Sequence, residues 1–567
     1  MSSNKRLILA IVLCTLVMLV YNFLMQVYYP QKPKKPSLPQ QERQEQKKVE
    51  QEQEEIAKEE PPKAEEQGEV TQDYELPKVE PKEVPFETGR FALKFSNKGG
   101  ALVSAKLKNY KNQSGKQDYE LLNSSSGALS LNVVGNKIYL SDVYWETEST
   151  EDSVIFSVPL PDGLEIKKVF SIRKDEYVID FKLFITNKGD KDVKAKLELV
   201  PFPGLTYDSD YRVQYYHYGF AGVKSTDWAI TYLSLPNAKE TKPNQEIGII
   251  KQPGMLWAGV KNRHFAGVFI PQDGDFIDSY EFRFMPSDKA AGQPEGNISC
   301  ILKTTDLEIK PNVDSIFNFK VFLGPQVYDE LAKQGNGIGY LFDYTGFDFI
   351  GFIILGILNF FYGMVGNYGW AIILTTLIIK IMLFPFDKKS QVSMFKMQKL
   401  QPKIVALREK YKNDKQKQGV EQMKLFKEYG VNPFSGCLPV LLSLPIYLGM
   451  YSVFDISVEL RQSPFLLWIS DLSQPDRLTK LPFSFFGYND LNLLPIIMTV
   501  TWLIQSFMMP LSPDPEQRMQ QRMMMFMPLL FGFMCYGLAS GLSLYFFVNS
   551  LFGIIEQKLI KKFYLKA

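Results

Sequence analysis

One lysine interrupts the longest apolar region of the chain and is the clearest candidate for a functional side chain. The stretch AIILTTLIIKIMLFPF occupies residues 371–386 and surrounds Lys380 with side chains that suit a membrane. A charge at bilayer depth costs about 3 kcal/mol on insertion scales, and such residues usually face a polar cavity. The alternative is snorkelling, in which the lysine stem reaches toward the cytoplasmic boundary near Asp387, about 10 Å along the helix.

Other polar side chains lie within apolar stretches and could share a wet groove with Lys380. Thr376 precedes the lysine by one helical turn, so the two lie on the same face. The later apolar stretches contain Ser443, Gln505, Ser506, Tyr545 and Asn549. Single hydroxyl groups are often only helix-packing contacts, but a lysine with several such neighbours predicts a hydrophilic groove.

A basic segment at residues 387–430 is predicted to form a helical hairpin at the membrane surface. It has twelve lysine and arginine residues against five acidic ones. Its apolar residues recur every three or four positions, which indicates amphipathic helix, and NDK at 413–415 breaks it in two. It could contact lipid headgroups or an acidic partner such as ribosomal RNA. Its candidate docking residues are Lys396, Lys399, Lys403, Arg408, Lys410 and Lys412.

Motifs for enzymes and metal sites are absent from the sequence. There is no P-loop, and GNGIG at 335–339 lacks the spacing of a dinucleotide-binding loop. The cysteines and histidines are too few and too scattered for a metal site. These residues are Cys14, Cys300, Cys437, Cys535, His217 and His264. We therefore expect no catalysis, no cofactor, no metal and no small-molecule substrate.

The 567 residues carry a formal net charge of only +2, which averages very different segments. Residues 1–29 contain an uncharged apolar run behind Lys5-Arg6, which predicts a span with a cytoplasmic N-terminus. Residues 30–85 are rich in Gln, Glu, Lys and Pro, as is typical of a flexible linker.

In residues 86–325, runs such as YVIDFKLFIT alternate between apolar and polar positions and are separated by turn sequences. This pattern predicts antiparallel strands in a large β domain outside the cytoplasm.

The distribution of charge indicates which apolar segments of the helical part cross the membrane. GNYG at 366–369 separates residues 348–365 from a span that begins at Trp370. If both segments crossed the membrane, the basic hairpin would lie outside, contrary to the positive-inside rule. We therefore expect 348–365 to lie along the outer membrane surface, within a connecting region at 326–368.

Six spans with both termini in the cytoplasm satisfy the charge pattern. Three further apolar stretches follow the hairpin, and the last of them holds two spans joined near Ser540. Five spans therefore form a core within 369–560, followed by a short basic tail at 561–567. The stretches are 436–456, 491–510 and 523–557.

Several long motifs in this order resemble the YidC branch of the YidC/Oxa/Alb membrane-protein insertases. LQPKIVALREKYKNDKQKQGVEQMKLFKEYGVNPFSGCLPVLLSLPIYLGMYSVF at 400–454 is similar to the cytoplasmic hairpin and the span after it. VELRQSPFLLWISDLS at 458–473 resembles the outer loop, and FMPLLFGFMCYGLASGLSLYFFVNSLFGIIEQ at 526–557 resembles the last two spans. The resemblance is close over 340–560 and looser over 86–325.

The resemblance implies a polytopic inner-membrane protein with a periplasmic β super-sandwich and a five-span insertase core. The core would enclose a groove open to the cytoplasm and to lipid, in which Lys380 attracts the polar or acidic tail of a substrate. The implied partners are nascent membrane proteins, the ribosome, Sec translocon components and the phospholipid bilayer. The groove cation is commonly arginine in this branch, and the tyrosine pair of the last span is Tyr545-Phe546 here.

Two other functions remain open from the residues. A transporter or channel would often show repeated halves around a midplane site, and the sequence has no such repeat. A membrane-bound periplasmic carbohydrate-binding protein is also compatible with the β domain, because this super-sandwich resembles mutarotase-like folds. That function would require a cleft with converging acidic and aromatic side chains, which the sequence alone does not locate.

Overall fold

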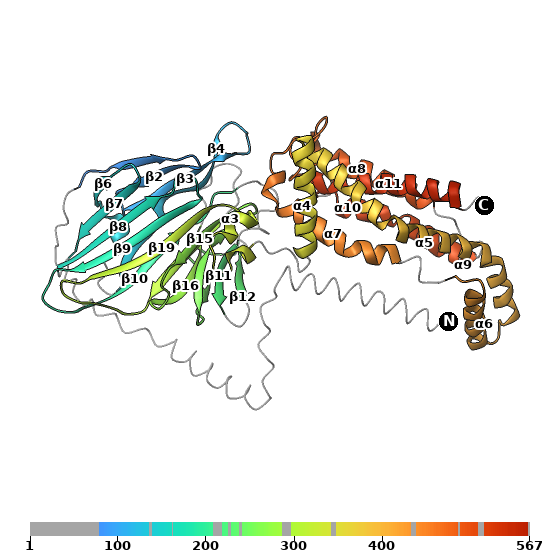
Figure 1. The fold of residues 1–567 in the computed structure, drawn as a ribbon, viewed down its shortest axis with the longest axis horizontal. Helices are drawn as coiled ribbons and strands as arrows, with labels where there is room; N and C mark the ends of the chain where they lie inside the picture. The colour runs from blue at the N-terminus through green and yellow to red at the C-terminus, as the bar shows by residue number, and fades with distance from the viewer. Residues whose placement is uncertain are drawn as a thin grey trace, which may run out of the picture. The chain divides into compact units, whose positions relative to one another are not determined.

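The computed structural model of the protein describes residues 79–564, apart from ten internal segments (Figure 1). The predicted N-terminal span in 1–29, nearly all of the linker 30–85 and residues 565–567 of the tail lie outside the described residues, as do Cys14, His217 and Cys437. The internal segments are 135–138, 161–162, 208–217, 225–227, 237–240, 286–295, 342–347, 432–437, 486–487 and 509–514.

Antiparallel strands between Glu83 and Pro325 build a large β-sandwich. Its widest sheet, within the described residues, has nine strands in the order β12 (Trp228–Ser234), β11 (Tyr218–Lys224), β14 (Met255–Lys261), β15 (Phe265–Pro271), β19 (Asp314–Pro325), β9 (Val178–Asn187), β8 (Leu164–Ile172), β7 (Ser153–Pro159) and β6 (Glu146–Ser149). The second sheet has the order β13 (Glu246–Ile250), β16 (Ile277–Met285), β17 (Asn297–Thr304), β10 (Val193–Phe202) and β18 (Leu307–Ile309), and β5 (Ser130–Val134) also pairs with β10. A third sheet holds β1 (Glu83–Glu87), β2 (Phe91–Ser96), β3 (Ala101–Lys111) and β4 (Asp118–Ala128), and a 3₁₀ turn, η1, covers Leu140–Asp142.

Aromatic pairs across neighbouring strands form the centre of this core. Phe170 of β8 stacks on Phe181 of β9 with ring centroids 4.9 Å apart, and Phe181 stacks on Phe319 of β19 at 5.3 Å. These residues are register partners, so each contact is a cross-strand pair of the kind that stabilises sheets. Alternate residues of β9 from Ile179 to Ile185 are buried, which confirms the period-two prediction.

The helical part begins after the β-sandwich and contains most of the described chain beyond residue 327. Helices α8 and α11 pack together, as do α4 and α7, α10 and α8, and α11 and α7. A hairpin of β20 (Thr479–Phe485) and β21 (Tyr488–Leu491) lies in the loop between α7 and α8. The helices are α3 (Tyr328–Ala332), α4 (Asp348–Val365), α5 (Tyr368–Lys410), α6 (Lys415–Glu428), α7 (Leu438–Ile456), α8 (Leu493–Phe507), α9 (Pro515–Met525), α10 (Met527–Met534) and α11 (Ser540–Tyr564), with 3₁₀ turns η4 (Ile338–Leu341) and η5 (Val458–Leu460).

Helix α5 is continuous for 43 residues and carries both the predicted span and the first half of the basic hairpin. The sequence suggested a span ending near Phe386 and a separate hairpin helix, but Pro385 lies inside α5 without ending it. A proline removes one backbone hydrogen bond, a cost that membrane helices tolerate where neighbouring groups satisfy the freed carbonyl. The break predicted at GNYG is present, with Gly366 at a φ of 67°. The break predicted at NDK, residues 413–415, is observed at residues 411–414, and Lys415 already begins α6.

Among the described residues, α5 is the one helix that is both long and apolar enough to cross a bilayer by itself. Shorter apolar helical stretches cover Ile350–Val365, Leu442–Ile456 and Leu493–Phe507. The last predicted pair of spans corresponds to α10, which has eight residues, and to α11, which begins at Ser540. The six-span count therefore stays a prediction.

Candidate functional site

Lys380 lies in a charged cluster that joins α5 to α11. Its Nζ is 3.8 Å from Oδ2 of Asp387 and 3.9 Å from Oε2 of Glu556. The three side chains are 17%, 12% and 9% exposed, respectively. Asp387 follows the lysine by two turns of the same helix, so both residues lie on one face. A cation with two carboxylates therefore lies in the apolar helical part of the protein.

Sequence reasoning identified the lysine of this cluster but neither carboxylate as its partner. The sequence pattern places Asp387 at the cytoplasmic end of the span and assigns no role to Glu556. Two signals were available. Asp387 lies seven positions after Lys380, which brings both to one helix face. Glu556 is the single acidic residue in the sequence of α11.

Two of the predicted groove residues, Asn549 and Gln505, contact a neighbouring helix. Nδ2 of Asn549 on α11 is 3.4 Å from the hydroxyl of Tyr447 on α7. The amide of Gln505 on α8 lies against Gly553 of α11, where even a Cβ atom would come within 2.4 Å of Nε2. Glycine at this position therefore gives the glutamine its place between the two helices. Ser443 and Ser506 are half-buried.

Tyr545 and Phe546 belong to an aromatic cluster. The Tyr545 ring is buried, with its centroid 6.2 Å from the ring centroids of both Tyr447 and Phe454. Phe546 lies edge-on to Trp502 of α8 at 5.5 Å and to Tyr447 at 5.9 Å. The second aromatic of the pair thus packs between helices α7, α8 and α11, a role that does not require a hydroxyl group.

Thr376 lies in a tightly packed part of α5. Its hydroxyl donates to the carbonyl oxygen of Ile372 one turn earlier, at 2.7 Å, and the residue is fully buried. This back-bond satisfies the hydroxyl within its own helix. Thr376 therefore contributes helix packing above Lys380 rather than an exposed polar surface.

The loop between α7 and α8 contacts the starts of both α8 and α11. The Asp476 carboxylate accepts hydrogen bonds from the backbone N–H groups of Leu493 and Leu494, at 2.9 and 2.8 Å, at the N-terminus of α8. The Ser540 hydroxyl at the start of α11 donates to the carbonyl oxygen of Asp471 at 2.7 Å. These contacts hold the ends of both helices through one loop, and capping carboxylates at a helix N-terminus are also electrostatically favourable.

The β-sandwich is joined to the helical part through the turn between β14 and β15. Arg263 donates from Nε to the carbonyl oxygen of Asp455 at 2.6 Å and from one terminal nitrogen to that of Ser473 at 2.8 Å. The neighbouring His264 bonds through Nδ1 with the carbonyl oxygen of Ile456 at 2.8 Å. Burial, with the adjacent Arg263 charge, lowers the pKa of His264 well below its ordinary value, so this contact is made by a neutral ring.

The distal hairpin, residues 403–429, presents its basic side chains to solvent. Asp414 caps α6 by accepting from the N–H of Lys417 at 2.9 Å. Lys403 donates to the hydroxyl of Tyr429 and lies over its ring, with Nζ 4.5 Å from the centroid. Of the six predicted docking residues, Lys396, Lys399, Lys403, Lys410 and Lys412 are exposed and Arg408 is half-buried. Ile404 and Phe426 are buried, which fits the amphipathic pattern.

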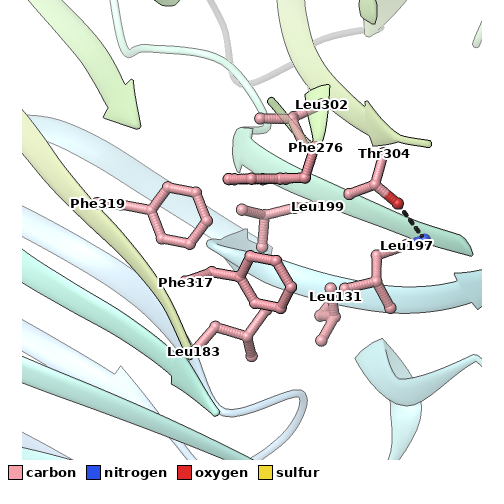
Figure 2. Close-up of a pocket in the computed structure, with 9 residues that line it drawn as sticks. All are labelled: Leu131, Leu183, Leu197, Leu199, Phe276, Leu302, Thr304, Phe317 and Phe319. Atoms are coloured by element: carbon pink, nitrogen blue, oxygen red, sulfur yellow. Dashed lines mark hydrogen bonds between the residues drawn. The ribbon is translucent and has the colours of Figure 1, made fainter. Parts of the chain in front are cut away.

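A pocket in the β-sandwich is lined by apolar side chains and one threonine. It is lined almost wholly by leucine and phenylalanine side chains from both large sheets (Figure 2). Its one hydroxyl, on Thr304, accepts a hydrogen bond from the N–H of Leu197 at 2.9 Å. The acidic and aromatic cleft that carbohydrate binding would need is therefore not provided by this described pocket. The lining residues are Leu131, Leu183, Leu197, Leu199, Phe276, Leu302, Thr304, Phe317 and Phe319.

The chain is similar to known proteins along most of its length. Residues 360–567 match the 60Kd inner membrane protein family, and residues 83–356 match the YidC periplasmic domain. The membrane protein insertase YidC of Syntrophus aciditrophicus (strain SB) is 32% identical over 500 residues, covering 85% of this chain and 85% of that protein.

Two solved structures are more distant. YidC from Thermotoga maritima is 14% identical with a TM-score of 0.28, and the match covers 85% of this chain and 98% of that one. A galactose mutarotase related enzyme from Lactobacillus acidophilus is 11% identical with a TM-score of 0.32, covering 43% and 97%.

Proposed function

The chain belongs to the YidC family of membrane protein insertases, and we propose that Lys380 is the charged point of its insertion groove. The observation that carries this proposal is the place of Lys380. It is a partly exposed cation on α5, the described helix that is long and apolar enough to cross a bilayer. Charged residues within membrane spans usually pair with one another or line a polar pathway, and an insertase requires such a pathway.

The groove would lower the barrier for a polar tail that has to cross the membrane. Lys380 attracts the acidic or polar tail of a nascent membrane protein, while half-buried Ser443, Gln505, Ser506 and Asn549 offer hydrogen bonds beside it. Thr376 and Tyr545 hold the helices that surround the groove. The apolar segment of the substrate then enters lipid, and its burial at about 25 cal/mol per Å² supplies the driving force without ATP.

The topology that suits this mechanism has six spans, with both termini in the cytoplasm and the β-sandwich in the periplasm. The groove would open to the cytoplasm and to lipid and be closed outside. The loop contacts of Asp476 and Ser540 support the closed outer end, because they bind the periplasmic ends of α8 and α11 to one segment. Helix α4 would lie along the outer surface of the inner membrane.

The exposed lysines of the basic hairpin would bind the partners that deliver substrates to the groove. A surface dense in lysine attracts anions such as ribosomal RNA and acidic headgroups. We propose the ribosome, Sec translocon components and the phospholipid bilayer as these partners. Neither a cofactor nor enzymatic chemistry enters the mechanism, because partitioning and charge attraction suffice.

Insertion assays with Lys380 variants test the proposed groove. In membranes depleted of the native protein, Lys380→Arg should support insertion of a small protein with an acidic tail, measured by protease protection. Lys380→Ala and Lys380→Glu should impair it, because the first removes the attraction and the second repels the tail. The matched control is Lys389→Ala, an exposed lysine on the same helix. Normal insertion by Lys380→Glu would exclude charge capture at this residue.

A further inference from the structure

Two carboxylates compete for Lys380 within the helical part. Its Nζ is 3.8 Å from Asp387 and 3.9 Å from Glu556, beyond the roughly 2.7–3.2 Å of a direct hydrogen bond. Each pair is therefore a Coulombic contact that lacks the directional bond of a tight ion pair. An incoming carboxylate that approached more closely would make the stronger contact.

The cluster is also unbalanced in charge. One lysine faces two carboxylates, so the cluster is net negative whenever all three groups are ionised. In addition, Oε1 of Glu556 is buried and has no hydrogen-bond partner among the described residues. Burying a carboxylate oxygen without a partner costs free energy. These features fit a contact that opens when a substrate arrives better than one that serves to hold the fold together.

We propose that Asp387 and Glu556 are internal counter-ions that a substrate must displace from Lys380, so that they set how many acidic residues a substrate tail needs. This inference rests on the proposed function of Lys380. Between substrates, the two carboxylates occupy the lysine and repel a weakly acidic tail. A substrate tail with several carboxylates displaces Asp387 and Glu556 from Lys380, whereas a tail with one carboxylate binds Lys380 weakly.

The test compares substrates that differ only in tail charge. Full-length protein is reconstituted in liposomes with Asp387→Asn, Glu556→Gln or both, and insertion is measured for matched tails with zero, one or two acidic residues. We expect the neutralised variants to insert the singly acidic tail about two- to fivefold better, the change that a weak ion pair is worth. The neutral tail should insert as in the wild type.

Controls separate charge competition from damage to the fold. Glu409→Gln neutralises an exposed carboxylate at the distal end of α5 and should leave the dependence on tail charge unchanged. Glu556→Asp retains the charge and should keep the wild-type preference. The amount of protein in the liposomes corrects for misfolding of any variant.

The outcomes distinguish this inference from the proposed function. If Lys380→Ala impairs the acidic tails but the neutralised variants keep the wild-type dependence on tail charge, the counter-ion role is wrong and the groove stands. If the neutralised variants change all tails equally, Asp387 and Glu556 act on the fold and the counter-ion role is again wrong. If Lys380→Ala inserts every tail normally, the proposed groove fails first.

Discussion

Arg263 in the β-sandwich and Asp455 at the end of α7 form a buried contact across 192 positions of sequence. The guanidinium donates to the Asp455 carbonyl oxygen at 2.6 Å and lies 3.4 Å from its carboxylate. The side chains are only 4% and 9% exposed. A planar guanidinium suits this place, because it donates in several fixed directions at once.

Loss of this arginine should destabilise the junction between the β-sandwich and the helices. Arg263→Ala leaves the Asp455 carboxylate buried without its cation, which typically costs about 3–5 kcal/mol. We expect a lower thermal unfolding midpoint for the purified protein in detergent and faster proteolysis near residues 455–473. The unfolding midpoint of Arg263→Lys should lie between those of the wild type and Arg263→Ala, because an ammonium group keeps the charge but lacks the planar fork of donors.

The matched control for Arg263 is another arginine in a carboxylate pair at the surface. Arg173 contacts Asp180 at 2.7 Å, but its side chain is well exposed. Arg173→Ala should cost about 1 kcal/mol or less, because water solvates both partners. Equal losses in the two variants would mean that burial of Arg263 contributes nothing to the junction.

Lys168 in β8 should make the stability of the β-sandwich depend on pH. Its side chain is fully buried and donates to the carbonyl oxygens of Gly99 and Leu129 at 2.7 and 2.8 Å, with Nζ 4.6 Å from the ring centroid of Trp145. Burial lowers the pKa of Lys168 to about 7 from its ordinary value of 10.5. Between these values the unfolded chain binds a proton that the folded protein lacks.

The free energy of unfolding should therefore rise with pH between about 7 and 10.5, and Lys168 contributes up to about 1.4 kcal/mol per pH unit to this rise. Below pH 7 both states are protonated and the contribution is constant. Lys168→Met should remove the slope, although it also leaves carbonyl groups without a donor and so lowers stability at every pH. The measurement is the difference in unfolding midpoint between wild type and variant from pH 6.5 to 9. A difference that does not vary with pH would contradict the lowered pKa.

Local patterns predicted the strands well, because burial on a sheet alternates along contiguous residues. In β9 the prediction was complete, and Lys168 of β8 even lies in phase with the buried residues Ile166 and Phe170. That phase was a readable sign of a buried lysine. The Arg263–Asp455 contact and the approach of Glu556 to Lys380 depend on how distant segments pack, which periodicity does not encode.

The continuity of α5 was missed for a different reason. Pro385 and the change from apolar to basic composition suggested a boundary near Phe386, but a change of environment along a helix does not itself end the helix. Within the candidate site, the lysine was identifiable from its cost in a membrane. The approach of Glu556 to Lys380 depends on the packing of α11 against α5, which the sequence pattern of either helix does not predict.

The hairpin lysines should bind anionic partners in a salt-dependent manner. Replacing Lys396, Lys399 and Lys412 with glutamine removes three exposed charges while retaining the buried Ile404 and Phe426. Binding to ribosomes, measured by cosedimentation, should weaken, and its dependence on salt should become shallower because fewer counterions are released.

Vesicle flotation separates the two kinds of hairpin partner. If the lysines serve lipid headgroups, the same variant should lose binding to vesicles with anionic lipids and keep its affinity for ribosomes. Gln416→Ala changes an exposed side chain of the same hairpin without changing its charge and serves as the control. Unchanged binding to both partners by the triple variant would exclude the hairpin as a docking surface.

Helix α4 should be accessible only from the periplasmic side. Ile354 and Leu358 are buried, whereas Ile353 and Met364 are 47% and 68% exposed, so cysteines at the last two positions can report on their surroundings. A helix along the outer surface keeps both ends at one interface. A membrane-impermeant maleimide added outside spheroplasts should label both cysteines, and the same reagent added to inverted vesicles should label neither. Labelling of either position from the cytoplasmic side would mean that α4 spans the membrane and would overturn the predicted topology.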